Sequence, residues 1–415
     1  MHKVPVDQLT PRMQVGKTVY GTHGEVLLAR GTSLGDEYIG QLKRRGFHNV
    51  WILDGIADDV EPAGLVSERL RAANVRNLQI MYDLMAEATQ TIRDQAAEEG
   101  AHIVPELPLE VGEVVHHHLQ LLDHDIEALL DEAIETKTLA SLASLKSHDN
   151  YTFEHSVDVA FYGVVLGKKL AFDRPYLKDL ALGCLLHDIG KMYVDERILR
   201  KPGRLTSKEF EQIKQHTVLG FQMLRQLPFG NTRPAHVALQ HHERQDGSGY
   251  PGKRFGNNRI FRTQQEHFDL RRINLLAELG AVADVCSALS SDRPYRTALP
   301  TPEVVRLLNE MADSHLNREA VNAFMGVVQL YPVGITVRVS GGRFDECVGV
   351  VVAQSSRRRN RPVIRLLFDR NAHEIRNGCD LNLQSEPDTV ELHSLPDIGI
   401  SMAEHAQHLV RRRAA

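Results

Sequence analysis

The sequence contains few cysteines and no long apolar run. Its four cysteines, Cys184, Cys286, Cys347 and Cys379, are far apart and do not have the spacing of a zinc site. Because disulfide-dense proteins belong to oxidising compartments, so few cysteines favour a reducing one. No apolar run has the length that crosses a membrane, and the first residues lack the apolar core of a signal peptide. We therefore expect a cytoplasmic protein without a membrane span.

Neither sign of charge is in large excess. The 415 residues carry 49 basic and 54 acidic side chains, which gives a formal net charge of −5. A nucleic-acid polymer is therefore not an expected partner, and an anionic ligand needs a local basic patch or a bound metal. Histidine, by contrast, occurs 21 times, and many of these residues lie between His116 and His267. This concentration makes metal chemistry worth testing.

The length predicts about two to four domains, and changes in the sequence pattern mark their boundaries. Short β-branched runs, one of them at 49–53, predict a small β-rich or α+β module at the N-terminus. Apolar residues at helical spacing follow as far as Gln329, and short strands with turn residues follow Tyr331. We expect a multidomain, mainly helical chain, divided into an N-terminal module at 1–58, a helical connecting region at 59–138, an all-helical domain at 139–330, a small β-barrel at 331–395 and a tail at 396–415.

An imidazole and a carboxylate stand side by side at His187 and Asp188. They follow an apolar run that predicts a buried helix, and Gly190 is well suited to end that helix. Adjacent helical residues point about 100° apart, so the pair can meet one metal site from the helix edge or bridge two neighbouring sites. Lys191 lies one turn beyond His187, where a cation can hold an anionic ligand. A solvated pair at a helix end is the alternative.

Further candidate metal ligands recur through the helical region, and none of them is a thiolate. Imidazole nitrogens and carboxylate oxygens suit first-row divalent metals, whereas a structural zinc finger would use cysteine. The set exceeds what one ion needs and fits two metals that share a bridging carboxylate, for which Asp188 is the natural choice. Any one of these histidines, taken alone, is equally well explained as a hydrogen-bonded core or surface residue. The candidate ligands are His155, His187, Asp188, His216, His241, His242 and Asp284.

The loop that follows His242 carries groups suited to ligand binding. Gly247 and Gly249 let the backbone approach a ligand closely. Tyr250 offers a ring for stacking, and Pro251 stiffens the exit from the loop. A plain surface turn would explain the glycines and the proline equally well.

Two arginines follow Asp284 at the end of its predicted helix. Arg293 and Arg296 project from the same end, and guanidinium groups commonly clamp phosphates and guanine edges. Capping of the helix C-terminus is the alternative role, because cations are favoured there.

Residues from about 139 to 329 resemble an HD-GYP domain, the cyclic di-GMP phosphodiesterase branch of the HD phosphohydrolase superfamily. The resemblance implies an all-helical fold with a di- or trinuclear iron or manganese centre. It also implies hydrolysis of cyclic di-GMP to linear pGpG, and often onward to GMP, in bacterial second-messenger signalling. The matching motifs are His187-Asp188-Ile189-Gly190-Lys191, Leu199 to Thr206, His216, His241-His242-Glu243-Arg244 with Asp246 to Pro251, and Asp284 with Arg293 to Arg296.

The resemblance assigns roles to individual residues. The seven candidate ligands would bind the metals, Asp188 and Lys191 would act in catalysis, and Lys191 would contact the scissile phosphate. The substrate-binding residues would be Lys191, Arg244, Asp246, Gly249, Tyr250, Pro251, Arg293 and Arg296.

The chain departs from the HD-GYP pattern at four places. Trinuclear members have a Glu four residues before the first histidine ligand, whereas this chain has Tyr151, which favours two metals. Ser287 stands where members commonly have Asp, and we expect it to weaken the support of the metal ligands. The stretch at 252–272 is longer than usual, and we expect it to form a lid or a subunit contact. The segment 315–317 replaces a usual Phe-Asp-Pro, and we expect it to matter for packing only.

A cyclic di-GMP phosphodiesterase is the leading hypothesis, and two alternatives stand beside it. A non-catalytic module would bind cyclic di-GMP, or protein partners through the Gly249-Tyr250-Pro251 loop. An HD phosphohydrolase would act on another nucleotide, such as a cyclic GMP-AMP dinucleotide. The loop and the two arginines favour a dinucleotide substrate, and the complete ligand set favours catalysis. A homodimer is compatible with the sequence.

Overall fold

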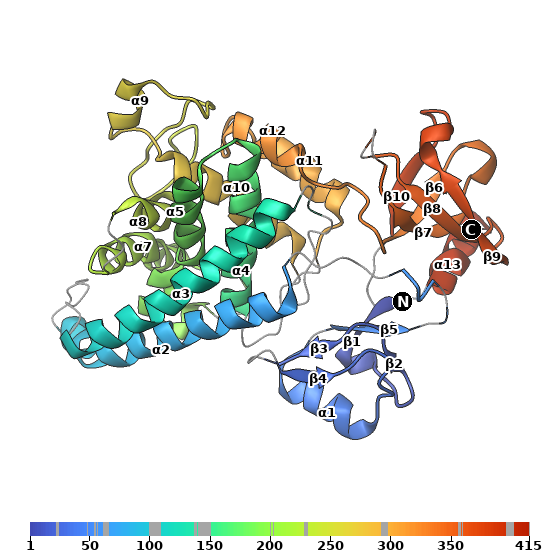
Figure 1. The fold of residues 1–415 in the computed structure, drawn as a ribbon, viewed down its shortest axis with the longest axis horizontal. Coiled ribbons are helices and arrows are strands. Elements are labelled where there is room, and N and C mark those ends of the chain that lie inside the picture. The colour runs from blue at the N-terminus through green and yellow to red at the C-terminus, as the bar shows by residue number, and fades with distance from the viewer. Residues whose placement is uncertain are drawn as a thin grey trace.

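The computed structural model describes residues 1–21, 25–47, 49–53, 55, 57–60, 66–98, 109–136, 139, 151–199, 201, 203–227, 231–291, 298–355, 358, 360–395 and 402–414. Figure 1 shows a large helical body with an N-terminal module and a C-terminal sheet to one side of it. The expected mainly helical architecture is confirmed.

The N-terminal module is a small antiparallel sheet with one α-helix. The central strand, β5 (Asn49–Leu53), has the bounds that its β-branched run predicts. It pairs with β1 (His2–Pro5) on one side and with β2 (Gln14–Val15) on the other. The other elements are η1 (Val6–Gln8), a β3 (Val19–Tyr20) and β4 (Val26–Leu28) hairpin, and α1 (Asp36–Arg44).

Helices make up the body that carries the candidate ligands. Two long helices, α2 (Glu68–Glu98) and α3 (Leu109–Glu135), lie against each other along one side of it in Figure 1. The remaining elements are α4 (Tyr151–Lys169), α5 (Arg174–Leu185), η2 (Ile189–Tyr193), α6 (Glu196–Leu199), α7 (Ser207–Leu224), α8 (Arg233–Gln240), α9 (Gln264–Phe268), α10 (Leu275–Ser290), α11 (Thr301–Met311) and α12 (Arg318–Met325).

The helix α10 is the centre of this body. Its sequence is apolar on nearly every side, as expected of a helix surrounded by others, and most of its residues are buried. It contacts α4, α5, α8, α11 and α12. The same hydrophobic core includes Leu78, Met81 and Met85 of α2 and Leu122 and Ile126 of α3. The two long helices are therefore packed parts of the body that holds the candidate site.

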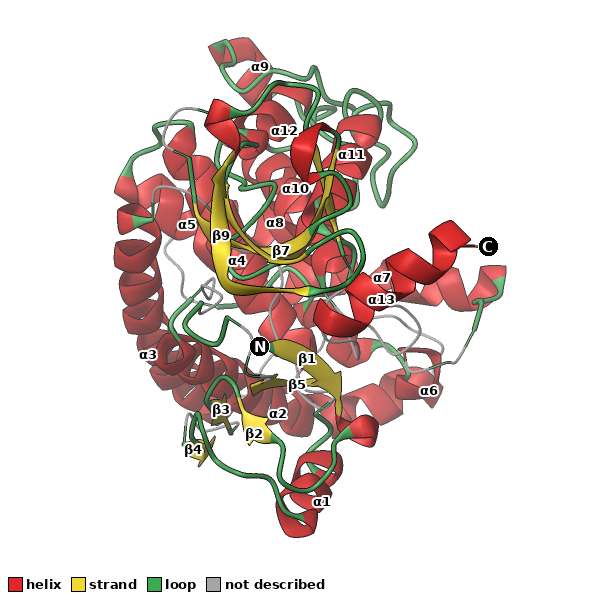
Figure 2. Ribbon diagram, turned by 90° about the vertical axis from the view of Figure 1, so that its right-hand side faces the viewer, coloured by secondary structure: helices red, strands yellow, loops and turns green. Residues whose placement is uncertain are grey.

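The C-terminal strands form one antiparallel sheet in the order β10-β6-β7-β8-β9. This order leaves β9 and β10 at the two edges, so the described strands form a curved open sheet (Figure 2) and do not close into the expected barrel. The buried Arg361 donates hydrogen bonds to four backbone carbonyls between Leu383 and Val390, in the connection from β9 to β10. These carbonyls thereby gain hydrogen-bond partners that strand pairing does not supply. The elements are β6 (Thr336–Ser340), η3 (Gly342–Phe344), β7 (Val348–Ala353), β8 (Val363–Phe368), β9 (Glu374–Asn382), η4 (Leu383–Ser385), β10 (Glu391–Ser394) and α13 (Met402–Ala414).

The chain between the N-terminal module and α2 contacts the C-terminal sheet. Val60 packs with Val348 and Phe368, and Asp59 forms an ion pair with Arg365 at 2.7 Å.

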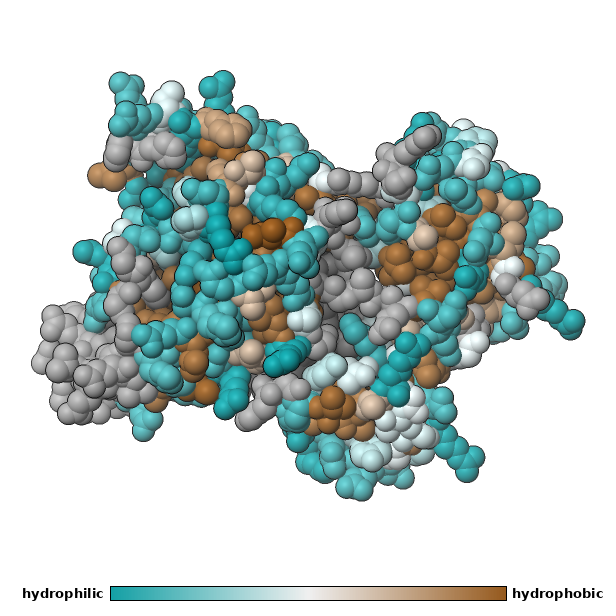
Figure 3. All heavy atoms as spheres, in the orientation of Figure 1, coloured by the Kyte–Doolittle hydropathy of each residue, from teal (hydrophilic) through white to brown (hydrophobic). Residues whose placement is uncertain are grey.

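Hydrophilic residues cover most of the helical body on the face drawn in Figure 3. Within the described residues, no helix has both the length and the apolar character to cross a membrane.

Candidate metal centre

The seven candidate ligands converge on one place in the helical body, although they come from five separate segments. His155 lies on α4, His216 on α7 and Asp284 on α10, while the two histidine-containing pairs follow α5 and α8. They form three overlapping groups, and within each group the ligand atoms lie within 4.8 Å of one another. The groups are His155, His187 and Asp188; His187, His241 and Asp284; and His216, His241 and His242.

The His187-Asp188 pair lies in a turn, so the prediction of a helix that continues to Gly190 is wrong. The helix α5 ends at Leu185, and the 3-10 helix η2 begins at Ile189. A Cβ atom on Gly190 would lie only 1.9 Å from the carbonyl oxygen of His216, so only glycine allows η2 to come this close to α7. The turn directs both side chains of the pair towards the ligand cluster, whereas consecutive residues of a straight helix would point about 100° apart.

Backbone carbonyls orient three of the histidine rings. The Nδ1 atom of His187 lies 2.7 Å from the Cys184 carbonyl oxygen, and that of His216 lies 2.5 Å from the Ile213 carbonyl oxygen. Nδ1 of His241 lies 3.0 Å from the carbonyl oxygen of Val237. A carbonyl can only accept, so each Nδ1 must carry the proton and donate it. When such a ring is neutral, its Nε2 atom is unprotonated and can ligate a metal.

His155 is oriented by side chains instead. Its Nδ1 atom lies 2.9 Å from the hydroxyl oxygen of Ser287, and its Nε2 atom lies 3.0 Å from an oxygen of Asp284. The serine therefore reaches the ring of the candidate ligand although it is shorter than aspartate. Its expected weakening of the site stays a prediction, since a neutral hydroxyl supports a histidine less strongly than a carboxylate does.

The two oxygens of Asp188 face different histidines. Oδ2 lies 3.2 Å from Nε2 of His187, while Oδ1 lies 3.5 Å from Nε2 of His216 and 3.8 Å from Nε2 of His241. Both Oδ1 of Asp188 and Nε2 of His187 are buried without a hydrogen bond to any described residue. Unpaired buried atoms of this kind are costly, and a cation between them would satisfy both. This carboxylate is therefore placed as the predicted metal bridge would be.

Burial controls the protonation of the cluster. It lowers the pKa of His216 to about 4 and that of His242 to about 3, and it places the pKa of His241 well below its usual value. Burial also opposes ionisation of Asp188, but the charges of His187 and Lys191 outweigh it and hold the pKa of this carboxyl well below its ordinary value. For His187, burial is outweighed by the neighbouring Asp188, so its pKa is raised. The other three imidazoles are neutral at pH 7, as metal ligation requires.

Tyr250 extends the ring system outward from the cluster. Its ring stacks on His242 with 4.8 Å between centroids, and its N–H donates to the His242 carbonyl at 3.2 Å. A Cβ on Gly249 would lie 2.5 Å from the backbone nitrogen of Arg244, so this glycine allows two backbone segments to touch. The close approach predicted for Gly249 is therefore made by the protein's own backbone.

Comparison with known proteins agrees with this geometry. Residues 137–320 match the HD domain family. The chain is 39% identical over 230 residues to a cyclic di-GMP phosphodiesterase of Pseudomonas aeruginosa. The matched region covers 55% of this chain and 51% of that protein. Residues 137–320 are therefore an HD domain.

Two further relatives match about half of the chain. A 3'3'-cGAMP-specific phosphodiesterase of Vibrio cholerae is 31% identical over 224 residues, or 52% of this chain and 48% of that protein. A cyclic di-GMP phosphodiesterase of Thermotoga maritima is 33% identical over 206 residues, or 48% of this chain and 50% of that protein. The chain thus spans about half the length of the curated relatives it matches.

The predicted substrate-binding residues are only partly brought to the cluster. Lys191 is there, with its Nζ atom 2.5 Å from Oδ2 of Asp188 and its side chain one-third exposed. Arg244 and Asp246 are exposed, and Asp246 accepts hydrogen bonds from the N–H and the hydroxyl of Ser248, which shapes the loop itself. Pro251 is also exposed, at the outer end of the loop. The predicted clamp, Arg293 and Arg296, lies outside the described residues, as does the side chain of Tyr151.

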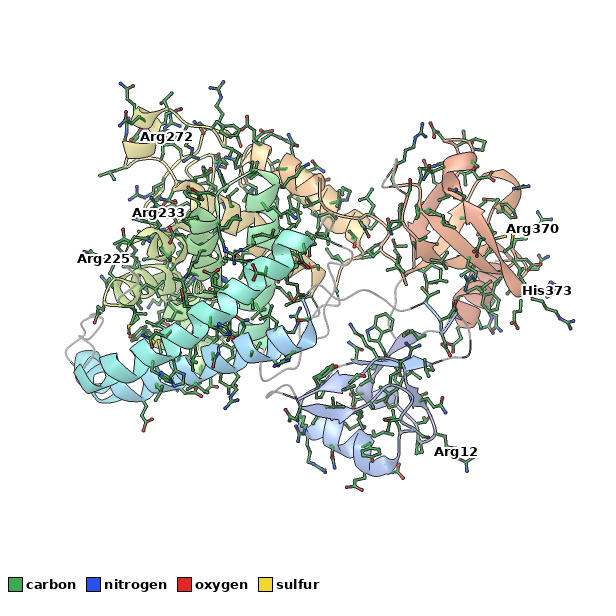
Figure 4. All side chains as sticks on the ribbon, in the orientation of Figure 1. Arg12, Arg225, Arg233, Arg272, Arg370 and His373 are labelled. Atoms are coloured by element: carbon green, nitrogen blue, oxygen red, sulfur yellow. The ribbon has the colours of Figure 1, made fainter. Side chains whose placement is uncertain are left out.

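The long stretch at 252–272 is anchored to α10 of the HD domain by a buried ion pair. Arg262 donates to Glu278 of α10 at 2.5 Å, and both side chains are almost fully buried. Glu278 also accepts from Gln245 at 2.9 Å and from Asn317 at 2.8 Å. Arg272, at the far end of the stretch, lies beside α9 in Figure 4. The roles predicted for this stretch, a lid or a subunit contact, stay predictions.

The segment 315–317 does more than the expected packing. Besides binding Glu278, Asn317 caps α12 by accepting from the Ala320 N–H, and the His315 carbonyl accepts from the Gln245 N–H at 3.3 Å. The segment therefore connects α12 with the loop that carries Tyr250. Burial of Asn317 and of Glu278 can be known only from the fold, which is why the sequence pattern did not reveal this connection.

One residue near the cluster was missed by the sequence analysis. Tyr82 lies on α2, outside the segment that resembles the family, and contacts Phe153 edge-to-face at 5.1 Å. Its hydroxyl is buried and has no hydrogen-bond partner among the described residues. Burial, and then the nearby charge of Asp188, raise its pKa well above the usual value. Its helical spacing with Leu78 and Met85 marks it only as a core residue, so no sequence signal distinguishes it.

Proposed function

We propose that the HD-GYP domain is a metal-dependent phosphodiesterase that hydrolyses cyclic di-GMP to linear pGpG, GMP or both. The observation that carries this proposal is the convergence of five imidazoles and two carboxylates around Asp188, whose two oxygens face different histidines. No thiolate takes part, so the donor set suits iron or manganese better than a structural zinc. The names of the relatives supply the substrate class.

The proposed cofactor is two divalent ions, iron or manganese. His155, His187 and Asp284 would hold one ion and His216, His241 and His242 the other, with Asp188 shared between them. Two such ions supply an activated water for attack on phosphorus and neutralise charge on the phosphoryl oxygens. A third ion is not proposed, because Tyr151 stands where a further carboxylate ligand would be needed.

The protein's own side chains would position the substrate. The ammonium of Lys191 lies 2.5 Å from Asp188 on a side chain that is one-third exposed, so it would contact the scissile phosphate and stabilise the charge that develops there. Tyr250 stacks on the proposed metal ligand His242, and a nucleotide would pass beside this ring. Arg293 and Arg296 are proposed to hold the second phosphate or a guanine edge.

Cyclic GMP-AMP is the second candidate substrate, because a relative named as specific for this dinucleotide matches 52% of the chain, against 55% and 48% for the two cyclic di-GMP phosphodiesterases. Binding of cyclic di-GMP or of a protein partner without catalysis is the third possibility. A direct comparison of substrates separates these functions.

The test is metal analysis of anaerobically purified protein, combined with chromatography of cyclic di-GMP and cyclic GMP-AMP reactions on the same sample. We expect about two metal ions per chain and faster turnover of cyclic di-GMP. Asp188→Asn should lose metal and turnover together, whereas His373→Gln, which changes an exposed histidine of the C-terminal sheet, should change neither. Faster turnover of cyclic GMP-AMP would reassign the substrate, and bound metal without turnover of either dinucleotide would refute the enzymatic proposal.

A further inference from the structure

A row of aromatic rings leads from the metal ligands to the protein surface. His216 contacts His242 at 5.2 Å between centroids, His242 stacks on Tyr250, and Tyr250 meets Phe210 of α7 edge-to-face at 6.2 Å. Phe210 is 43% exposed, so one end of the row is buried at the candidate ligands and the other end reaches solvent.

A cation lies over the outer two rings of this row. The Nζ atom of Lys214 is 4.9 Å from the centroid of Phe210 and 5.6 Å from that of Tyr250. Phe210 and Lys214 are four residues apart on α7 and therefore share one face of that helix. Lys214 also pairs with the exposed Glu211 at 2.6 Å, and an ion pair this accessible is readily exchanged for another anion.

We propose that Phe210 and Lys214 form an outer nucleotide subsite of the HD-GYP domain. One base of the cyclic dinucleotide stacks on the ring of Phe210, and the ammonium of Lys214 leaves Glu211 to bind the phosphate attached to that nucleoside. Stacking on an exposed ring accepts any base, and the cation adds attraction for the anionic backbone. This inference rests on the proposed function, because it takes the substrate to be a dinucleotide held at the metal centre.

Packing gives no competing explanation for both residues. A single exposed apolar side chain is common on protein surfaces. Phe210, however, does not belong to the hydrophobic core of the helical body, and its ring contact is with Tyr250, which itself stacks on a candidate metal ligand. The pair is therefore placed where the nucleoside farther from the metals would lie.

Two variants test the stacking. Phe210→Leu keeps an apolar side chain on α7 but removes the aromatic face, and we expect it to raise KM for cyclic di-GMP about ten- to a hundredfold with little change in kcat. Phe261→Leu is the matched control, because Phe261 is 79% exposed and lies outside the ring row. It should leave KM unchanged. An unchanged KM for Phe210→Leu, or an equal rise in the control, would overturn the proposal.

A spectroscopic variant separates this inference from the proposed function. Phe210→Trp adds a second tryptophan to a chain that has one, Trp51, which lies in the N-terminal module. Guanine stacked on the new ring should quench its fluorescence, with saturation near the KM for cyclic di-GMP and no such change in the wild-type protein. If the wild-type protein has no turnover, the proposed function fails, and saturable quenching alone decides whether the subsite exists. Absence of quenching overturns the subsite even if turnover is normal.

The cation is tested in the same assays. Lys214→Met should raise KM about fivefold or more and reduce the salt dependence of kcat/KM, because a phosphate contact is lost. Lys208→Met removes an exposed lysine from the same helix and serves as the control. Equal effects of the two lysine variants would assign the change to overall charge and remove Lys214 from the subsite.

Discussion

Arg262→Ala should destabilise the HD domain far more than a typical loop substitution. Among the described residues, the variant leaves the buried Glu278 carboxylate with two donors, Gln245 and Asn317. Removing one partner of a buried ion pair costs about 3–5 kcal/mol. For a domain of this size, each kcal/mol lowers Tm by about 2–4 °C, so we expect a decrease of roughly 6–20 °C.

The stability lost in Arg262→Ala should also increase as the pH rises from acid to neutral. Burial, which outweighs the attraction of Arg262, raises the pKa of Glu278 above its usual 4.5. The folded state therefore binds the proton more tightly than the unfolded state, and stability falls as pH rises through and above 4.5. Without Arg262 the pKa rises further, so the destabilisation should be smallest in acid and largest at neutral pH.

Calorimetry at matched metal content measures both effects. Arg306→Ala removes an ion pair that is half-exposed on α11 and should leave Tm unchanged. Adding Glu278→Gln to Arg262→Ala removes the unpaired charge and should restore a large part of the lost stability. If the double variant is no more stable than Arg262→Ala, the cost does not come from the buried charge and the reasoning is refuted.

Three other substitutions probe the metal centre. Ser287→Ala removes the hydroxyl beside His155 and should lower metal affinity about ten- to a hundredfold, measured by chelator competition; unchanged affinity would mean that the contact gives no support. Tyr82→Phe removes a buried hydroxyl with no partner among the described residues, so thermal unfolding should show an unchanged or higher Tm, and a clear decrease would reveal a bond that the hydroxyl makes. Gly190→Ala places a methyl group against the His216 carbonyl, and it should lower both Tm and metal content by pushing η2 away from α7; normal values of both would show that the close approach is dispensable.

The sequence predicted which candidate ligands lie close together, but it did not predict the local backbone structure that orients them. Side chains such as His155 and His241, 86 positions apart, can be grouped because their donor types match one chemistry. The position of His187 in a turn was missed, since the apolar pattern continues past Leu185 and the reason for the break is the contact of Gly190 with another helix. Local pattern carries no information about such a contact.

The same limit applies outside the metal centre. Strand β5 has the bounds that its sequence predicts, because the β-branched and aromatic residues at 49–53 all favour a short buried strand. Closure of the C-terminal sheet was predicted wrongly, since it depends on which edges pair, and here Arg361 binds the carbonyls of the connection between β9 and β10. Tyr82 was overlooked because its helical spacing with Leu78 and Met85 is the same whether its side chain only packs in the core or also faces a site.

The packing of α2 against η2 has a consequence for the smallest piece of this chain that can fold. Cutting the chain at residue 139, where the family resemblance begins, would remove Leu78, Met81 and Met85 from the hydrophobic core and open the side of the metal centre next to Tyr82. Such a fragment would expose a broad apolar surface and is expected to aggregate. We therefore expect a stable fragment of the helical body to begin near residue 66, where its hydrophobic core begins.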